Sequence, residues 1–361
     1  MNELRLDLGN RSYGIIIGQS VLDRAGEFIA RLPVGRKVLI VTDNTVGHLY
    51  AERVYHSLTE AGLEPVLVQF ASGEEQKTLA NAYIIYDHAF SEGLDRHSVM
   101  VALGGGVIGD LTGFAAATYM RGVPFVQLPT TLLAQVDSSV GGKVAVNHPR
   151  GKNIIGAFYQ PSLVLADTDV LATLETRELY SGLAEIIKYG VIGDAEFFTW
   201  LEDNLLSMLA LEPKALAKAI KQSCLSKARL VEKDETEQGV RALLNFGHTT
   251  GHAIETLAGY GRYTHGEAVA MGSVVAAQLG VLMELISQAE ADRITGLLRR
   301  ANLPVRVPDF LSDKELIQAM YGDKKTVNGS ITFIAPAAIG RAVIRNGIED
   351  DLIRKAIEAV R

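Results

Sequence analysis

Between residues 37 and 166 the chain alternates short apolar runs, rich in β-branched residues, with stretches of helical periodicity. Strands are expected over residues 37–42, 64–70, 98–103, 125–129 and 162–166, and helices over residues 45–61 and 78–92. Strands that alternate with helices form βαβ units and a mostly parallel sheet. The near-continuous apolar character of these strands predicts that both faces of the sheet are covered.

After residue 167 the pattern changes, because residues 175–300 show long helical patterns and few strand signals. Residues 331–344, interrupted by Pro336 and Gly340, are expected to form a late hairpin, and residues 350–360 a closing helix. We therefore predict an α/β protein, with a mostly parallel sheet domain at residues 1–172 and a mainly helical domain at residues 173–361. A cleft between two such domains is a common place for a small-molecule site.

Charge and cysteine content exclude several classes of protein. The 361 residues include 35 Lys and Arg against 42 Asp and Glu, a formal net charge of −7. The chain has no basic run, so neither a nucleic-acid partner nor a membrane partner is expected. Cys224 is the only cysteine, which excludes an intrachain disulfide and a thiolate-rich metal site.

Two segments bear on location. Residues 1–10 lack the apolar core of a signal peptide. Residues 268–286 contain Gln278 and Glu284 among many small residues, as a buried helix would. We therefore expect a cytoplasmic protein.

The sequence Gly104-Gly-Gly-Val-Ile-Gly109 follows an expected strand and precedes Asp110, where a helix could begin. Its spacing matches the glycine-rich turn of Rossmann-like domains, in which the backbone approaches a pyrophosphate at a helix N-terminus. An ordinary strand–helix turn would look the same. The Rossmann fingerprint normally follows the first strand of its unit, whereas this turn follows the third. Asp43, at the end of the first clear strand, could bind ribose hydroxyls instead.

Three histidines lie within eighteen residues. His248 and His252 share one face of an expected helix, and His265 follows seventeen residues after His248. An expected helix at residues 179–189 adds Glu185 and Lys188. Two His and one Glu with an open fourth position form a ligand set of catalytic zinc. Spacing alone does not decide which two of the three histidines bind metal.

Cationic side chains gather around the glycine-rich region at Arg121, Lys143 and Lys152. Lys143 and Lys152 are expected in Gly- and Ser-rich loops, where backbone N–H groups could help to hold a phosphate. Solvated surface is the alternative for each cation. Trp200, Cys224 and the methionines are interpreted as packing residues.

Five stretches of the sequence resemble the 3-dehydroquinate synthase family. They are residues 104–123, 128–162, 184–193, 243–256 and 265–273, in the family's order. The resemblance covers nearly the whole chain. It implies a homodimeric lyase of the shikimate pathway, which leads to chorismate and the aromatic amino acids. It also implies NAD and one divalent metal, Zn²⁺ or else Co²⁺, as cofactors.

The resemblance assigns the metal ligands to Glu185, His248 and His265. Residues 1–172 become the NAD-binding domain and residues 173–361 the metal- and substrate-binding domain. The family often has Asp at the position of Ser72. The implied cofactor-binding residues are Asp43, Ser72, Gly73, Glu74, Glu75, Gln76, Lys77, Gly106, Val107, Ile108, Gly109, Asp110, Thr130, Thr131, Lys143, Lys152, Val170, Leu171, Ala172 and Thr173.

The remaining implied residues contact the substrate. Arg121 is expected to reach the phosphate from the other subunit of a dimer, and Asp137 to lie near the nicotinamide. A lysine of residues 322–326 also matches; Lys325 is favoured over Lys324. The implied catalytic residues are Lys143, Lys188, Glu185, His252, Asn245 and Arg241, and the implied substrate-binding residues are Arg121, Asp137, Lys152, Asn153 and Lys325.

The implied reaction converts 3-deoxy-D-arabino-heptulosonate 7-phosphate to 3-dehydroquinate and phosphate. Transient oxidation of C5 by NAD makes the C6 proton acidic, so that phosphate leaves by β-elimination. Re-reduction, ring opening and an intramolecular aldol closure follow. The alternatives are another sugar-phosphate cyclase, a glycerol-dehydrogenase-like oxidoreductase, and a regulatory NAD- or metal-binding protein. The pair Lys152–Asn153 and the spacing of Arg241 and Asn245 argue against a dehydrogenase. The pair Lys152–Asn153 and the His248/His252 motif favour the synthase over other cyclases.

Overall fold

A computed structural model of the chain describes residues 1–259, 261–322 and 331–361. Its internal contacts form two compact units, one of residues Met1–Leu174 and Leu216–Glu235, the other of Glu175–Ala215 and Thr236–Arg361. The expected domain boundary after residue 172 lies two residues before the first break. Residues 216–235 include most of helix α8 (Pro213–Lys233). The predicted boundary places them in the helical domain, but they group with the first unit, because the buried face of α8 contacts Gln135 and Asp137.

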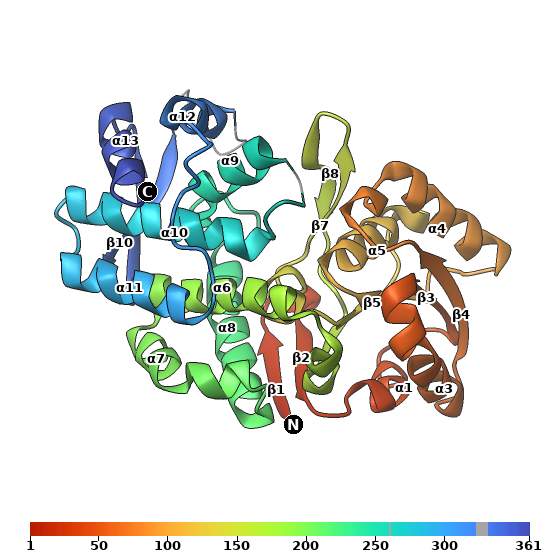
Figure 1. The fold of residues 1–361 in the computed structure, drawn as a ribbon. Coiled ribbons are helices and arrows are strands. Elements are labelled where there is room, and N and C mark those ends of the chain that lie inside the picture. The colour runs from red at the N-terminus through yellow and green to blue at the C-terminus, as the bar shows by residue number, and fades with distance from the viewer. Residues whose placement is uncertain (260, 323–330) are drawn as a thin grey trace. The chain divides into compact units, whose positions relative to one another are not determined.

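The first unit is built on a seven-stranded sheet with the order β1-β2-β9-β6-β5-β3-β4 (Figure 1). Every neighbouring pair is parallel except β1 and β2. The predicted α/β fold with a mostly parallel sheet is confirmed. The strands are β1 (Asn2–Leu6), β2 (Tyr13–Gly18), β3 (Lys37–Asp43), β4 (Glu64–Phe70), β5 (Val99–Gly104), β6 (Phe125–Pro129) and β9 (Leu163–Asp167).

Helices cover this sheet on both faces, as its apolar strands predict. Leu39 and Met100 point with alternate residues of β3 and β5 into a core shared with α4 and α5. Val38 and Val101, which have the opposite parity, are fully buried as well. The helices of this unit are α1 (Ala25–Ile29), α2 (Asn44–Val46), a π-helical segment Gly47–Ala51, α3 (Glu52–Glu60), α4 (Leu79–Ser91), α5 (Gly106–Thr118) and most of α8 (Pro213–Lys233).

Two further strands of the first unit contain Lys143 and Lys152. Residues Lys143–His148 form β7 and Gly151–Phe158 form β8, an antiparallel hairpin outside the main sheet. The placement of Lys143 and Lys152 in Gly/Ser-rich loops is therefore wrong, since both lie in strands. The reason is that Val144 and Val146 alternate with small or polar residues, and their side chains are buried in the core with α5.

The second unit is mainly helical, as predicted. The late hairpin forms from β10 (Thr332–Ala338) and β11 (Arg341–Asn346). The apolar helix α10 is almost entirely buried, and none of the helices within the described ranges is long and apolar enough to cross a membrane. The helices are α6 (Thr176–Gly193), α7 (Ala195–Leu209), α9 (His248–Ala258), α10 (His265–Leu282), α11 (Gln288–Arg300), α12 (Asp313–Tyr321) and α13 (Asp350–Glu358).

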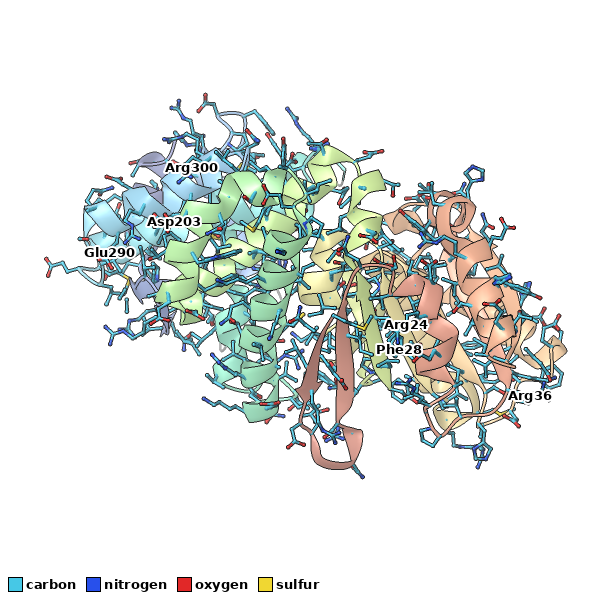
Figure 2. All side chains as sticks on the ribbon, turned by 90° about the horizontal axis from the view of Figure 1, so that it is seen from below. Arg24, Phe28, Arg36, Asp203, Glu290 and Arg300 are labelled. Carbon is cyan, nitrogen blue, oxygen red and sulfur yellow. The ribbon has the colours of Figure 1, made fainter. Side chains whose placement is uncertain are left out.

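Charged side chains of both units form short-range contacts with neighbouring residues; Figure 2 labels Arg24, Phe28 and Glu290, which take part in three of them. In the first unit the Arg24 guanidinium lies 4.9 Å from the centre of the Phe28 ring and also pairs with Glu27. In the second unit Glu290 closes a capping box with Ser287 at the start of α11. Such exposed contacts contribute about 0–1 kcal/mol each, so stability comes mainly from the buried cores.

Candidate active site

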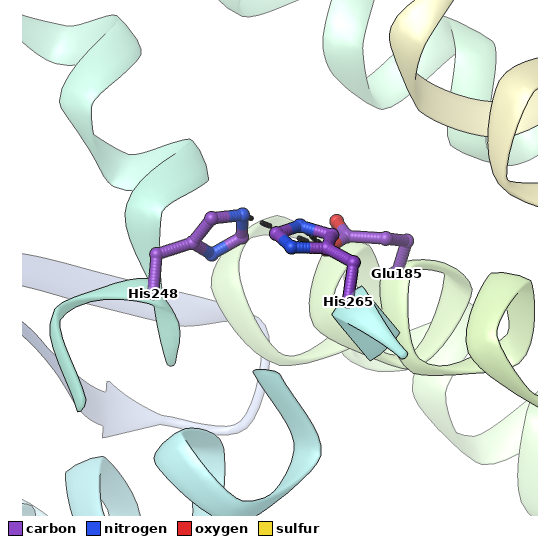
Figure 3. Close-up of side chains that lie close together, drawn as sticks. All are labelled: Glu185, His248 and His265. Carbon is purple, nitrogen blue, oxygen red and sulfur yellow. Dashed lines mark ion pairs between the residues drawn. The ribbon is translucent and has the colours of Figure 1, made fainter. Parts of the chain in front are cut away.

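Three side chains from three helices of the second unit meet at one point (Figure 3). Glu185 lies in the middle of α6, and His248 and His265 are the first residues of α9 and α10. One ligand atom of each lies within 4.8 Å of the others. The two imidazole Nε2 atoms lie 3.6 Å and 3.7 Å from the same oxygen, Oε1 of Glu185.

The protonation of His248 shows what its Nε2 can do. Its Nδ1 lies 2.9 Å from the carbonyl oxygen of Phe246, which can only accept a hydrogen bond. Nδ1 therefore carries the proton, and in the neutral ring Nε2 presents a lone pair toward Glu185. A lone pair and a carboxylate oxygen repel each other unless a cation or a proton lies between them.

Glu185 has a fully buried carboxylate, and Oε1 has no hydrogen-bond partner among the described residues. Lys188, one turn later on α6, contacts Oε2 and balances one charge. A buried acceptor without a partner costs about 1–3 kcal/mol, and more when it is charged. Two ligand atoms about 2.0–2.2 Å from a tetrahedral ion are roughly 3.3–3.6 Å apart, close to the 3.6 Å and 3.7 Å found here. These residues therefore fit a divalent cation.

Close backbone contacts hold the helices that carry these ligands. A Cβ atom added at Gly266, the residue after His265, would lie 2.1 Å from the carbonyl oxygen of Ser181 on α6. The Gly266 N–H also donates to the Ser181 hydroxyl at 2.9 Å. A Cβ atom added at Gly272 would lie 2.0 Å from the carbonyl oxygen of Gly247. Gly247 directly precedes His248 and has a positive φ of 78°. Only glycine permits both contacts, so these positions set the distance between the ligands.

Other predicted site residues of the second unit lie near this cluster or are buried. The ring of His252 has its centre 5.5 Å from that of His248 and 6.0 Å from that of His265. Arg241 and Lys188 are almost fully buried, and Asn245 donates to Glu237 at 3.0 Å. Lys324 and Lys325 lie outside the described residues.

Most of the predicted cofactor residues of the first unit lie at or after the carboxyl ends of the sheet strands, whereas Lys143 and Lys152 lie in the β7–β8 hairpin. The chain passes from β3 to β4 on one side and then to β5 on the other side of β3. Open α/β sheets bind ligands outside the strand ends at such a switch point. Asp43 ends β3 and Gly104 ends β5, so the topology explains why the glycine-rich turn follows the third of these strands.

The glycine-rich turn leads into a helix N-terminus that has no side-chain cap. The first N–H groups of any α-helix have no partner within the helix. At α5 the N-cap residue is Gly105, which has no side chain to accept a hydrogen bond from them. A Cβ atom at Gly105 would lie 3.0 Å from the Thr131 methyl group, and the Thr130 N–H donates to the Gly104 carbonyl at 3.0 Å. A helix N-terminus bounded by small residues fits a pyrophosphate.

The remaining cofactor positions are joined by hydrogen bonds. Ser72 donates to Asp43 at 2.9 Å, although the family often has Asp at this position. Lys77 and Asp110 form an ion pair of 2.5 Å, and burial raises the pKa of the Asp110 carboxyl while the Lys77 ammonium opposes this rise. Thr173, in the segment Thr168–Thr173 that contains Val170, Leu171 and Ala172, contacts the hydroxyl of Tyr50 at 2.5 Å.

Two of the predicted phosphate-binding residues of the first unit have left-handed backbone conformations. Arg121 and Asn153 have positive φ angles of 68° and 53°, as does Met120 at 49°. Residues held in this region cluster at functional sites, where other contacts compensate the strain. For Asn153 one contact is the side chain of Asn147, which accepts its N–H at 2.9 Å and donates to Glu74 at 2.8 Å.

Sequence reasoning missed one candidate, Lys227. Its ammonium group lies 2.7 Å from the carbonyl oxygen and 2.9 Å from Oδ1 of Asp137, and its side chain is mostly buried. The signal was present in the sequence, because Lys227 lies on the buried face of α8 with Leu216, Ile220, Cys224 and Val231. A lysine on an apolar helix face is rarely buried without a counter-charge.

The fold and the Glu–His–His cluster define a member of the sugar-phosphate cyclase superfamily. Residues 67–181 match the family description "3-dehydroquinate synthase N-terminal", and residues 182–326 match "3-dehydroquinate synthase C-terminal". The chain therefore belongs to the 3-dehydroquinate synthase family. It has 3-dehydroquinate synthase activity and acts as a phosphate-eliminating lyase of the shikimate pathway.

Individual relatives agree with this placement. The 3-dehydroquinate synthase of Pelotomaculum thermopropionicum is 55% identical over 359 residues, 99% of this chain and 97% of that protein. Among solved structures, 2-epi-5-epi-valiolone synthase from Streptomyces hygroscopicus with NAD⁺ and Zn²⁺ bound has a TM-score of 0.90, with 30% identity over 98% of each chain. A 2-deoxy-scyllo-inosose synthase with carbaglucose-6-phosphate, NAD⁺ and Co²⁺ has a TM-score of 0.90, with 27% identity over 100% of each chain.

Proposed function

We propose that this chain carries out its synthase reaction with NAD bound by the first unit and one zinc ion bound by Glu185, His248 and His265. The substrate would be 3-deoxy-D-arabino-heptulosonate 7-phosphate, and the products 3-dehydroquinate and phosphate. The observation that carries this proposal is the buried Glu185 carboxylate, whose Oε1 faces two imidazole nitrogens and has no hydrogen bond within the part of the chain described. Two related synthases of known structure contain NAD⁺ with Zn²⁺ or Co²⁺.

Bound NAD supplies a reversible hydride acceptor, and a bound divalent cation supplies a Lewis acid next to the reacting oxygen. The chain's own residues then position the substrate and move protons. Lys188 balances the charge of Glu185, so that the cluster tolerates burial. His252, close to both histidine ligands, is placed to exchange a proton with substrate oxygens. Arg241 and Asn245 are proposed to bind substrate oxygens.

The phosphate group needs cations, because the chain as a whole is acidic. We assign this role to Arg121, Lys143 and Lys152, with the amide of Asn153. Arginine and lysine form charge-assisted hydrogen bonds with phosphate oxygens, which are about twice as strong as neutral ones. These side chains would orient the substrate phosphate for β-elimination. An oxygen of the phosphate can then accept the C6 proton as the phosphate leaves. The Lys227–Asp137 pair is proposed to hold Asp137 beside the nicotinamide.

We further propose that the protein is a cytoplasmic homodimer. Exposed apolar side chains lie beside the predicted phosphate-binding residues: Met120 precedes Arg121, and Ile154 follows Asn153. A dimer interface at the predicted phosphate-binding residues would cover both side chains. Light scattering coupled to gel filtration measures the mass directly, and a monomer at micromolar concentration would contradict the proposal.

The decisive experiment measures phosphate release when the total substrate is in large excess over NAD. With zinc present, phosphate release should exceed the amount of NAD many times, and NADH absorbance should not accumulate. Deuterium at C5 should remain on the corresponding carbon of the product. Stoichiometric NADH would instead indicate a net dehydrogenase. Phosphate release that continues after both cofactors are stripped would contradict their role.

A substrate panel tests the nearest alternative. Related cyclases of 27–30% identity share the fold, whereas 3-dehydroquinate synthases reach 55% identity. We expect the heptulosonate phosphate to be turned over and glucose 6-phosphate, the parent sugar of the carbocyclic analogue in one relative, to be inert. Equal turnover of both would contradict the substrate assignment.

A further inference from the structure

His265 lies between two carboxylates. Its Nε2 is 3.7 Å from Oε1 of Glu185, and its Nδ1 is 3.3 Å from Oε2 of Glu255. Glu255 lies on α9, two turns after His248, and its side chain is 12% exposed. Neither the sequence motifs nor the implied ligand set assigns a role to Glu255.

The contact with Glu255 determines the tautomer of His265. An ionised carboxylate only accepts hydrogen bonds, so the proton of the neutral imidazole lies on Nδ1. Nε2 is then left with its lone pair directed at Glu185. His248 has the same arrangement, with the Phe246 carbonyl at Nδ1 and Glu185 near Nε2. Both histidines are thus prepared to bind a cation through Nε2.

We propose that Glu255 is a positioning residue, which holds the Nδ1–H of His265 and thereby orients its Nε2 toward the metal. This proposal rests on the proposed metal site of Glu185, His248 and His265. A carboxylate at the far nitrogen fixes the ring and raises the basicity of the ligating nitrogen. The loss of such a partner typically weakens metal binding about 10- to 100-fold.

A second set of possible ligands shares these residues. His252, Glu255 and His265 also present ligand atoms within 4.8 Å of one another, and all three are partly exposed. In the first set, by contrast, Glu185 and His248 are buried. A cation bound by Nδ1 of His265 while Nε2 binds another would require the ring to lose both protons. The geometry therefore favours one ion, with Glu255 outside its ligand shell.

The test measures zinc affinity of the full-length protein by competition with a chromophoric chelator. Glu255→Ala should bind Zn²⁺ about 10- to 100-fold more weakly than the unmodified chain. Glu255→Gln should lose less, because its amide oxygen still accepts the Nδ1–H but carries no charge. The visible absorption of the Co²⁺-loaded protein should change in Glu255→Ala and be largely restored in Glu255→Gln.

Glu267→Gln is the matched control. Glu267 lies two residues after His265 on α10, where it caps the helix and pairs with Arg177 at 2.6 Å. Its loss should lower thermal stability but leave Zn²⁺ affinity and the Co²⁺ spectrum unchanged. Equal effects of Glu267→Gln and Glu255→Ala would overturn the positioning role, since both would then act only through folding.

Two further outcomes separate this proposal from the metal site itself. If Glu185→Gln abolishes zinc binding and Glu255→Ala does not weaken it, only the positioning role fails. If Glu185→Gln keeps its zinc, the proposed metal site fails. Two zinc ions per chain, one of them lost in Glu255→Ala, would make Glu255 a ligand and also overturn the proposal.

Discussion

The candidate sites of the two units differ in how their charges are balanced. In the first unit the acidic groups at predicted cofactor positions already have partners, such as Lys77 for Asp110 and Asn147 for Glu74. In the second unit the fully buried Glu185 has a cationic partner at one oxygen, while the other faces two imidazole nitrogens. The proposed cofactor site of the first unit is thus electrostatically balanced by its own side chains, whereas the proposed metal site of the second unit would be balanced by a cation.

The two sites also differ in how their residues come together. Most of the proposed cofactor positions follow neighbouring parallel strands, so the sheet aligns them. The proposed metal ligands come from three helices, and their distances depend on glycine contacts such as Gly266 against Ser181. We therefore expect substitutions near the metal cluster to have larger effects than substitutions at the cofactor turn.

The largest effect is expected for Glu185→Gln, which removes the only carboxylate of the metal set. A Lewis acid lowers the activation barrier by several kcal/mol. Without it, kcat/KM should fall by at least about 1,000-fold. Metal content by mass spectrometry and phosphate release measure the two losses. Glu178→Gln, a partly buried Glu on the same helix, should keep its metal. A Glu185→Gln protein with full zinc and normal turnover would remove the difference between the units.

A smaller effect is expected for Gly266→Ala. The added Cβ would lie 2.1 Å from the Ser181 carbonyl, so α10 must move away from α6 and carry His265 with it. Overpacking of this kind costs about 1–3 kcal/mol, which thermal unfolding detects, and zinc affinity should fall as well.

Gly296→Ala is the control for this glycine. Gly296 lies in α11 of the same unit, and a Cβ there would meet nothing within 4 Å. Because alanine is the better helix former, stability should rise by about 0.5–1 kcal/mol with zinc affinity unchanged. Similar zinc affinity in the two variants would contradict the idea that close helix contact sets the ligand distances.

Lys152→Met tests the first unit. One charge-assisted hydrogen bond is worth about 1.5–3 kcal/mol, so kcat/KM should fall about 10- to 100-fold, while metal content and unfolding temperature stay the same. Arg150→Met removes an exposed cation from the same hairpin and should change kcat/KM much less. Loss of zinc in Lys152→Met would mean that the two sites are not separate in function.

The smallest effect is expected for Cys224. Burial raises the pKa of its thiol to about 12. At pH 8 the thiolate fraction is therefore only about one in 10,000, and it rises tenfold with each pH unit up to that pKa. Thiol reagents should react with the folded protein very slowly at pH 8, and Cys224→Ala should keep normal turnover. Rapid labelling of the folded chain would show that α8 opens away from Gln135, the partner of this thiol at 3.3 Å.

Local patterns in the sequence determine much of this protein. Strand and helix periodicity place β3, β4, β5, β6 and β9 within a residue or two, because apolar alternation and glycine stops act over short distances. The motifs also contain every residue of the Glu–His–His cluster, since each ligand lies in a recognisable segment.

Tertiary structure alone decides which groups meet. Spacing left open which two of three histidines face Glu185, and the packing of α6 against α10 groups His248 and His265 with it. The β7–β8 hairpin, the grouping of α8 with the first unit and the contact of Glu255 with His265 likewise depend on residues distant in the sequence. Burial and electrostatic partners arise only when separate elements pack, so no local pattern contains them.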